Sequence, residues 1–279
     1  MDHFLQALMH YEFLQNALLG GILASIGCGV MGTYVVVKRI GYLAGGIAHS
    51  VLGGMGIAYF LGRDPVGGAL LAALIVALII GWVNLRWRQH QDTIIGALWA
   101  VGMAIGIIFI TRTPGYDVDL MSYLFGNILL IPPGEISVLA ALDGVILGLV
   151  TLFYKQLVAI TFDEQFARLR GVHVELIYLL LLCLVALTVV ILIQVVGLIL
   201  VIALLTLPAA IAAQYLRAII PIIVAATVLA TVFTTGGLAL SYEMDLPSGA
   251  TIILLAGAVY FASTIASGVM HQRHGSDHS

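Results

Sequence analysis

The chain has 279 residues, of which 62% are hydrophobic and only 9% charged, and its mean hydropathy is +1.13. A soluble domain is about 25% charged, and its surface needs that charge to remain in water. This composition excludes soluble enzymes, nucleic-acid-binding proteins and disordered scaffolds. The formal net charge of −3 separates few classes, because the positions of the charges carry more information than their sum.

Intervals without charged residues are long enough to cross a lipid bilayer. A bilayer core of about 30 Å needs about 20 helical residues. The interval 176–216 is twice that length and predicts two spans that turn near Gln194–Gly197, and the interval 136–154 predicts another span although it contains Asp143. Six further intervals predict one span each: 13–37, 40–62, 65–85, 93–111, 218–242 and 246–272. The expected fold is therefore an all-α polytopic transmembrane bundle of about nine spans, with eight to ten allowed.

The rest of the chain divides around these spans. Residues 1–12 are expected to form an outer N-terminal segment, 13–268 the transmembrane domain and 269–279 a cytoplasmic tail. The apolar interval 120–131 is too short for a span and predicts a re-entrant or interfacial segment. The three tail histidines are expected to be solvated and not to sense metal, because a chain end usually frays.

Lysine and arginine predict the orientation. If the N-terminus is outside, only Arg63 and Arg112 face outward. The other nine face the cytoplasm: Lys38, Arg39, Arg86, Arg88, Lys155, Arg168, Arg170, Arg217 and Arg273. This bias agrees with the positive-inside rule and predicts a bundle with its N-terminus outside and its C-terminus inside.

Small residues inside the spans predict close helix packing. The pairs Gly41/Gly45, Gly102/Gly106 and Gly144/Gly148 have the small-xxx-small spacing that lets helix backbones approach. Pro208 is expected to kink or break its span, because proline removes a backbone hydrogen bond. Cys28 and Cys183 lie in apolar runs and are interpreted as small buried residues.

Ionisable residues at membrane depth are the first candidates for an ion pathway. His49 lies in the second predicted span among glycines, and either lines a pathway or bonds a backbone carbonyl of a neighbouring helix. Asp143 is interpreted first as a structural hydrogen-bonding group, protonated or paired with Asn127. Asp117, Asp119, Glu243 and Asp245 form a second candidate set near the outer mouth. Their carboxylates attract cations there or are ordinary solvated loop residues.

The longest predicted cytoplasmic loop contains an amphipathic segment. Asp163 and Glu164 begin it, Arg168 and Arg170 end it, and both pairs match the dipole of a short helix that Gly171 would terminate. Three apolar side chains share one face of that helix: Phe162, Phe166 and Leu169. Such a helix either binds a partner protein or lies on the bilayer surface.

Four segments resemble the permease subunits of ABC importers for zinc, manganese and related divalent metals. Residues 162–172 resemble the coupling helix of that family, and 118–126 its "VDLMAYLFG" segment. Residues 196–210 resemble its "VGxLLVxxLLxxPAA" span, and 241–249 its "SYxxDxPSG" outer loop. The matches are collinear over roughly residues 13–268.

The resemblance implies a permease dimer, two cytoplasmic ATPase subunits and an extracytoplasmic metal-binding protein, with the metal ion as cargo and no permanently bound cofactor. It also implies that six residues contact the ATPase: Phe162, Asp163, Glu164, Phe166, Arg168 and Gly171. The permease itself is then not an enzyme, and it lies in a bacterial or archaeal inner membrane. No Walker A pattern occurs in the chain.

One position departs from the family. Zinc and manganese members have Asp four residues before the pathway histidine, and here that position is Gly45. Residues i and i+4 share a helix face, so a possible two-ligand site has lost its carboxylate. Zinc accepts imidazole nitrogen more readily than manganese does, so the departure favours zinc slightly.

Three other functions remain open from the sequence. A permease for a metal chelate would need a wider and less acidic pathway. A stand-alone secondary transporter or channel would not need a cytoplasmic helix for a motor protein. An intramembrane hydrolase would need a base beside a hydroxyl such as that of Ser50.

Overall fold

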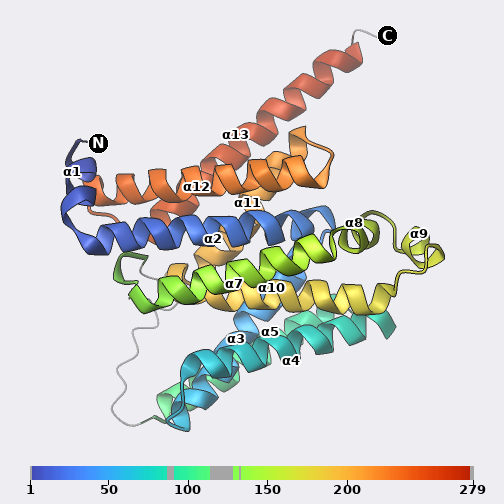
Figure 1. Ribbon diagram of the computed structural model, residues 1–279, viewed down its shortest axis with the longest axis horizontal. Helices are drawn as coiled ribbons and strands as arrows, with labels where there is room; N and C mark the ends of the chain where they lie inside the picture. Colours follow the sequence, from blue (N-terminus) through green and yellow to red (C-terminus); the bar gives the residue numbers. More distant parts are fainter. Residues whose placement is uncertain (1, 87–90, 114–127, 132, 277–279) are drawn as a thin grey trace.

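The structure is a computed structural model of the chain, and it describes residues 2–86, 91–113, 128–131 and 133–276. The described residues form helices and contain no strand (Figure 1). The helices are α1 (Asp2–His10), α2 (Glu12–Val37), α3 (Gly41–Phe60), α4 (Pro65–Arg86), α5 (Gln91–Thr111), the 3₁₀ turn η2 (Ile128–Leu130), α7 (Pro133–Leu152), α8 (Tyr154–Phe162), α9 (Glu164–Leu169), α10 (Val174–Val196), α11 (Leu198–Tyr215), α12 (Ile219–Met244) and α13 (Ser248–Ser276).

Nine of the described helices are long and apolar enough to cross a membrane: α2, α3, α4, α5, α7, α10, α11, α12 and α13. The all-α fold and the nine expected spans are therefore confirmed. The long interval 176–216 divides at Gly197, whose φ of 76° lies in the left-handed region. Glycine adopts that conformation without a steric penalty, so α10 ends and α11 begins there.

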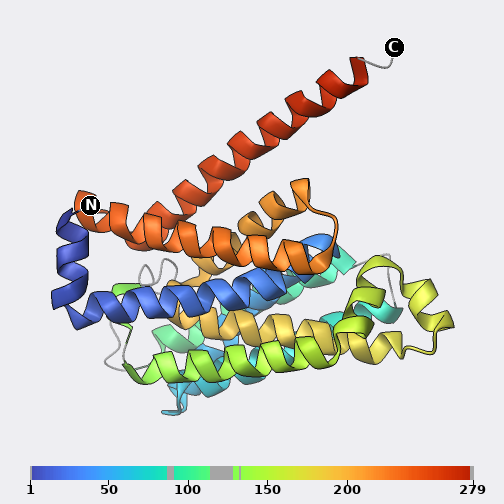
Figure 2. The same cartoon turned by 45° about the horizontal axis from the view of Figure 1, so that its top comes forward.

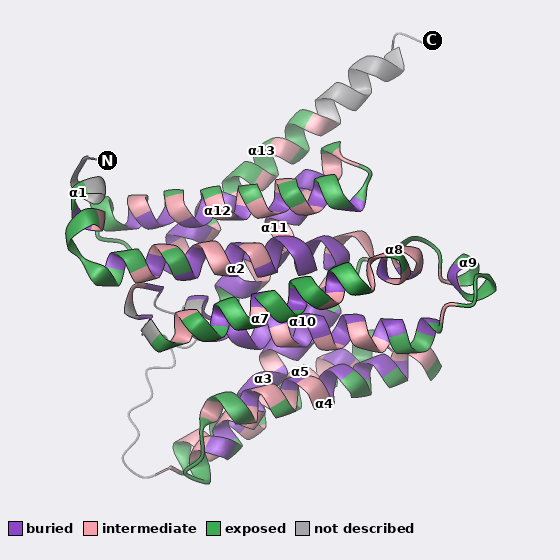
Figure 3. Cartoon of the chain, viewed as in Figure 1, coloured by how far each residue is buried: buried purple, intermediate pink, exposed green. Residues whose placement is uncertain are grey.

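Helices α2 and α10 lie in the centre of the bundle. Most of their residues are buried, whereas α5 and α7 present mainly exposed side chains (Figure 3). Helix α2 packs against α12, α11, α7 and α10. A helix that is apolar on all sides can be buried on all sides, and the sequences of α2 and α10 have this property.

Helices α3 and α5 pack with their backbones in close contact. A Cβ atom built on Gly102 would lie 2.7 Å from Ser50 Cα, and one on Gly106 would lie 2.7 Å from the backbone carbon of Leu52. The expected role of this glycine pair is confirmed. For Gly144 and Gly148 the expectation is wrong within this chain, because a Cβ atom on either would meet nothing within 4 Å.

Pro208 lies inside α11, and the helix does not end there. The helix continues from Leu198 to Tyr215, so the expected break does not occur. Gly32 of α2 packs directly against the backbone carbonyl of Leu205, one turn before the proline. The surrounding helices thus hold α11 together through the position where proline interrupts its hydrogen bonding.

The two ends of the bundle differ. Helix α1 and the end of α12 lie at one end, and the α8–α9 hairpin lies at the other (Figure 1). Helix α13 diverges from the bundle and carries the C-terminus away from it (Figure 2). It extends to Ser276, beyond the expected boundary at residue 268, because no proline interrupts this segment.

Candidate functional site

The segment 162–172 forms the expected short helix. Asp163 caps α9, with its Oδ1 accepting hydrogen bonds from the backbone N–H groups of Gln165 and Phe166, both at 2.9 Å. Gly171 follows the helix with a φ of 78°. The N–H of Val172 donates to the carbonyl of Ala167 at 3.1 Å, which closes a Schellman motif. Both ends of this helix are therefore encoded locally.

The apolar face of α9 has no partner within the described chain. Leu169 is 87% exposed, Phe162 58% and Phe166 51%, whereas Ala167 on the opposite side is fully buried. The guanidinium of Arg170 lies 5.1 Å from the centroid of the Phe166 ring. The α8–α9 hairpin lies at the end of the bundle and projects from it (Figure 1). Phe162 ends α8, so the exposed apolar side chains of α9 itself are Phe166 and Leu169, and the predicted single helix over Phe162–Leu169 is broken at Asp163. Exposed side chains of this kind suit contact with a partner protein or with the bilayer surface.

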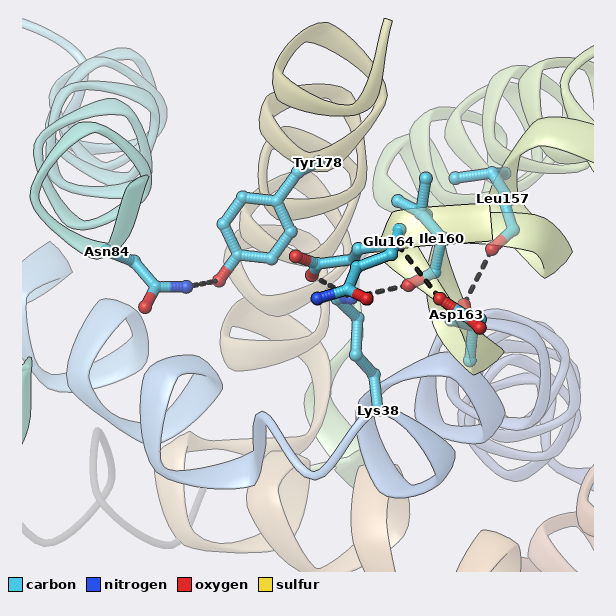
Figure 4. A network of polar contacts seen from close by, with 9 residues as sticks. Lys38, Asn84, Leu157, Ile160, Asp163, Glu164 and Tyr178 are labelled. Carbon is cyan, nitrogen blue, oxygen red and sulfur yellow. Dashed lines mark hydrogen bonds and ion pairs between the residues drawn. The ribbon is translucent and has the colours of Figure 1, made fainter. Parts of the chain in front are cut away.

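Lys38, which in the sequence contributes only to the predicted membrane orientation, lies against the α8–α9 hairpin. Lys38 Nζ donates hydrogen bonds to Glu164 Oε1 at 2.7 Å and to the carbonyl of Ile160 at 2.6 Å (Figure 4). Its side chain is 9% exposed. A cation at the end of an apolar run is the only sequence signal for this residue, and that signal does not indicate a partner.

The imidazole of His49 stacks on the indole of Trp99 from α5. The ring centroids are 3.9 Å apart and the planes differ by 10°. His49 is partly buried, and its Nδ1 atom has no hydrogen-bond partner among the described residues. His49 therefore contacts the neighbouring helix through its ring. Among the described residues it forms no hydrogen bond to a backbone carbonyl, which was the structural role considered for it.

Gly45 shares the Trp99-facing side of α3. A Cβ atom there would lie 3.8 Å from Trp99 Cζ3, which is ordinary van der Waals contact. The place of the family carboxylate is therefore open to a side chain and is bordered by the indole. Trp99 itself is held by a hydrogen bond from Nε1 to Met103 Sδ at 3.2 Å.

A groove of about 1010 Å³ runs beside this site between α3, α4 and α5. Its lining is almost entirely apolar, with Arg63 and Asp64 at one end and Ser50 within it. The Ser50 hydroxyl is directed to the carbonyls of Gly46 and Leu98, at 2.7 and 3.0 Å. The hydroxyl has no base beside it, so nothing in this geometry supports an intramembrane hydrolase.

The candidate outer acids are only partly described. Asp117 and Asp119 lie outside the described residues. Asp245 and Glu243 are both exposed near the end of α12. Asp245 adopts a φ of 53°, a conformation that Asp tolerates better than most residues, and so it forms the turn into α13.

That turn is closed by Ser241, whose hydroxyl donates to the carbonyl of Leu246 at 2.5 Å. The "SYxxDxPSG" segment therefore forms the turn that connects α12 to α13.

Asp143 is buried in α7 near Gly27 and Cys28 of α2. Its Oδ2 atom has no hydrogen-bond partner among the described residues, and Asn127, its expected partner, lies outside them. Among the described residues no three His, Cys, Asp or Glu side chains gather where they could hold a metal ion. A transported ion would need only weak and transient contacts.

Nine apolar helices in the described part of the chain define a multi-pass membrane protein. The chain belongs to the ABC 3 transport family, whose family model matches residues 10–267. The resemblance drawn from the sequence is confirmed at this level.

The relatives cover almost the whole chain. A Synechocystis membrane protein, slr2045, is 47% identical over 255 residues, which are 91% of each chain. The manganese transport system membrane protein MntC of Halalkalibacterium halodurans is 34% identical over 260 residues, covering 93% of this chain and 89% of MntC. A chain of PsaBC from Streptococcus pneumoniae, solved in complex with Fab, superposes with a TM-score of 0.85 at 31% identity and 94% coverage of both chains.

Proposed function

We propose that this chain is the translocation subunit of an ATP-driven importer for divalent metal ions of the zinc or manganese class. The observation that carries the proposal is the capped helix α9, with its exposed Phe166 and Leu169, at one end of a bundle that superposes on a PsaBC chain. A relative named as a manganese transport system membrane protein supports the cargo.

In this proposal the α9 end faces the cytoplasm and binds an ATPase subunit, which hydrolyses ATP. The N-terminus is outside and the C-terminus inside. Two permease subunits and two ATPase subunits assemble, and an extracytoplasmic binding protein delivers the ion. Asp119, Glu243 and Asp245 attract the cation at the outer mouth.

His49 lines the ion path. Its Nδ1 atom is buried without a hydrogen-bond partner, and it can bind a passing metal ion once the ring is uncovered. A stand-alone transporter would leave the apolar face of α9 without a purpose, so the ATP-driven mechanism accounts for more of the structure. No observation favours a metal chelate as the cargo over a bare ion.

The proposal is tested at Phe166, which is 51% exposed at the centre of the proposed coupling surface. Phe166→Asp places a carboxylate on the apolar contact and should abolish binding of the ATPase and ATP-driven uptake of zinc or manganese into proteoliposomes. Phe166→Leu keeps an apolar contact and should retain both. The α9 backbone does not depend on this side chain, since Asp163 and Gly171 terminate the helix.

Uptake at the wild-type rate in Phe166→Asp would contradict the coupling role of α9. Uptake that continues without ATP or ATPase would instead support a stand-alone transporter.

A further inference from the structure

Lys38 occupies the break between α8 and α9. Its ammonium group touches both sides of that break, at the Ile160 carbonyl of α8 and at the Glu164 carboxylate of α9. The residue itself is the C-cap of α2, and its side chain is 9% exposed. Figure 4 shows the ammonium directed into the hairpin from the end of α2.

Both contacts have an electrostatic reason. Ile160 is in the last turn of α8, where backbone carbonyls lack partners within the helix and the dipole is negative. Glu164 is in the first turn of α9, where a carboxylate is favoured and also faces the ammonium. The Lys38 ammonium thus neutralises the C-terminal end of α8 and the Glu164 carboxylate of α9, and it joins both helices to α2.

The contact continues into two more helices. Lys38 Nζ lies 5.3 Å from the centroid of the Tyr178 ring of α10, within the range of a cation–π interaction. The Tyr178 hydroxyl accepts a hydrogen bond of 2.6 Å from Asn84 Nδ2 of α4. Helix α4 packs against α3, the helix that carries His49.

We propose that Lys38 is the positioning residue that holds the coupling helix to the transmembrane core, so that displacement of α9 by the ATPase moves α2, α10 and α4. This inference rests on the proposed coupling function of α9. Residues 160 and 164 follow Lys38 by 122 and 126 positions in the sequence. The Lys38 clamp, which consists of Lys38 with Ile160 and Glu164, therefore joins parts of the chain that no other described ion pair links.

The chain supplies a matched control pair. Arg168 Nη2 and Glu175 Oε1 are also 2.7 Å apart, but their side chains are 63% and 49% exposed. This pair links α9 to the start of α10 in water, where an ion pair contributes little because solvent screens it. In the Lys38–Glu164 pair the side chains are only 9% and 34% exposed, so the two pairs separate the effect of this partly buried contact from a general effect of charge near α9.

The experiment measures metal uptake and ATP hydrolysis by the assembled transporter in proteoliposomes. Lys38→Gln should preserve assembly and ATP hydrolysis but lower the number of ions transported per ATP by about fivefold or more, the lower end of typical coupling effects. Lys38→Arg keeps the cation and should restore much of this ratio. Glu175→Gln, which removes the exposed pair at a residue outside the proposed ATPase contact, should leave it near the wild-type value.

Glu164→Gln is the second variant, for the case that Lys38→Gln does not fold. It removes the negative charge but keeps an oxygen that can accept a hydrogen bond from Lys38. It should lower the same ratio, and the double variant with Lys38→Gln should be no worse than the poorer single one. Additive effects, or uptake and hydrolysis that fall in equal proportion, would overturn the positioning role. A wild-type ratio in Lys38→Gln would overturn it as well.

Phe166→Asp separates this inference from the proposed function. If Phe166→Asp abolishes ATP-driven uptake while Lys38→Gln transports normally, α9 couples to the ATPase and the clamp is wrong. If neither variant changes uptake, the coupling function itself is wrong.

Discussion

At the scale of single residues, the unusual feature is the pairing of Gly45 with His49. The sequence indicates that a carboxylate of the family pattern is missing, and the structure places the Trp99 indole against both positions. An aromatic face cannot replace an oxygen ligand, although it can fix the orientation of an imidazole by stacking. The structure thus leaves the stacked His49 ring with its Nδ1 atom buried and without a hydrogen-bond partner among the described residues.

Gly45→Asp should create a metal site. Its Cβ would be 3.8 Å from Trp99, so the side chain fits, and Asp at i with His at i+4 shares one helix face. We expect zinc and manganese to raise the melting temperature of the purified variant more than that of the wild type. The affinity gain should be about 1.4 kcal/mol or more, which is tenfold, with a larger gain for manganese because it prefers oxygen.

Gly46→Asp is the control for this substitution. A side chain there would collide with Ile95 of α5, so α3 and α5 could not pack and metal should not stabilise the variant. A Gly45→Asp protein that folds but shows no response to metal would contradict the placement of this helix face.

At the scale of helices, glycine spacing predicted close packing at three places, and the structure uses them differently. Gly102 and Gly106 contact the α3 backbone, Gly41 and Gly45 have ordinary contacts, and the third pair, on α7, faces open space. All three pairs have the same four-residue spacing. The pairs differ in how each helix is rotated about its own axis. The sequence of a helix that is apolar on all sides does not encode this rotation.

Gly106→Ala and Gly144→Ala should therefore have opposite effects on stability. The first places a methyl group 2.7 Å from the Leu52 backbone carbon and should cost about 1–3 kcal/mol, as overpacking does. The second meets nothing within 4 Å and should stabilise α7 by about 0.5–1 kcal/mol through helix propensity.

Thermal unfolding of the detergent-solubilised chain measures both effects. Destabilisation by Gly144→Ala would show that this face of α7 packs against something outside the chain.

The coupling helix illustrates the opposite case at this scale. Asp163, Gly171 and the apolar face of α9 were predicted from eleven consecutive residues, and each has the expected local conformation. Caps and short amphipathic faces depend on neighbours within one or two turns. The binding role of this face stays a prediction until the ATPase is present.

At the scale of the whole molecule, the nine apolar helices of the described chain would place the two ends on opposite sides of a membrane if each crosses it once. The basic residues predict that the side carrying α9 is the cytoplasm. Which side is the cytoplasm is tested by cysteine labelling. The background is Cys28→Ala with Cys183→Ala, since both native cysteines lie within spans. Leu169→Cys and Met244→Cys report on the two ends, and both positions are well exposed.

In intact cells an impermeant maleimide should label Met244→Cys and spare Leu169→Cys until the membrane is permeabilised. The reverse pattern would invert the proposed orientation and with it the coupling role of α9.

The amino-acid sequence by itself determined that there are about nine spans, that the chain turns near Gln194–Gly197 and that Asp163 and Gly171 bound a short helix. Each depends on a property of consecutive residues: apolar length, backbone freedom or a cap. Only the tertiary structure decided the stacking of Trp99 on His49, the different surroundings of equivalent glycine pairs and the burial of Lys38 against Ile160 and Glu164. These features bring together residues from separate helices, and apolar helices reveal neither their neighbours nor their facing sides before they pack.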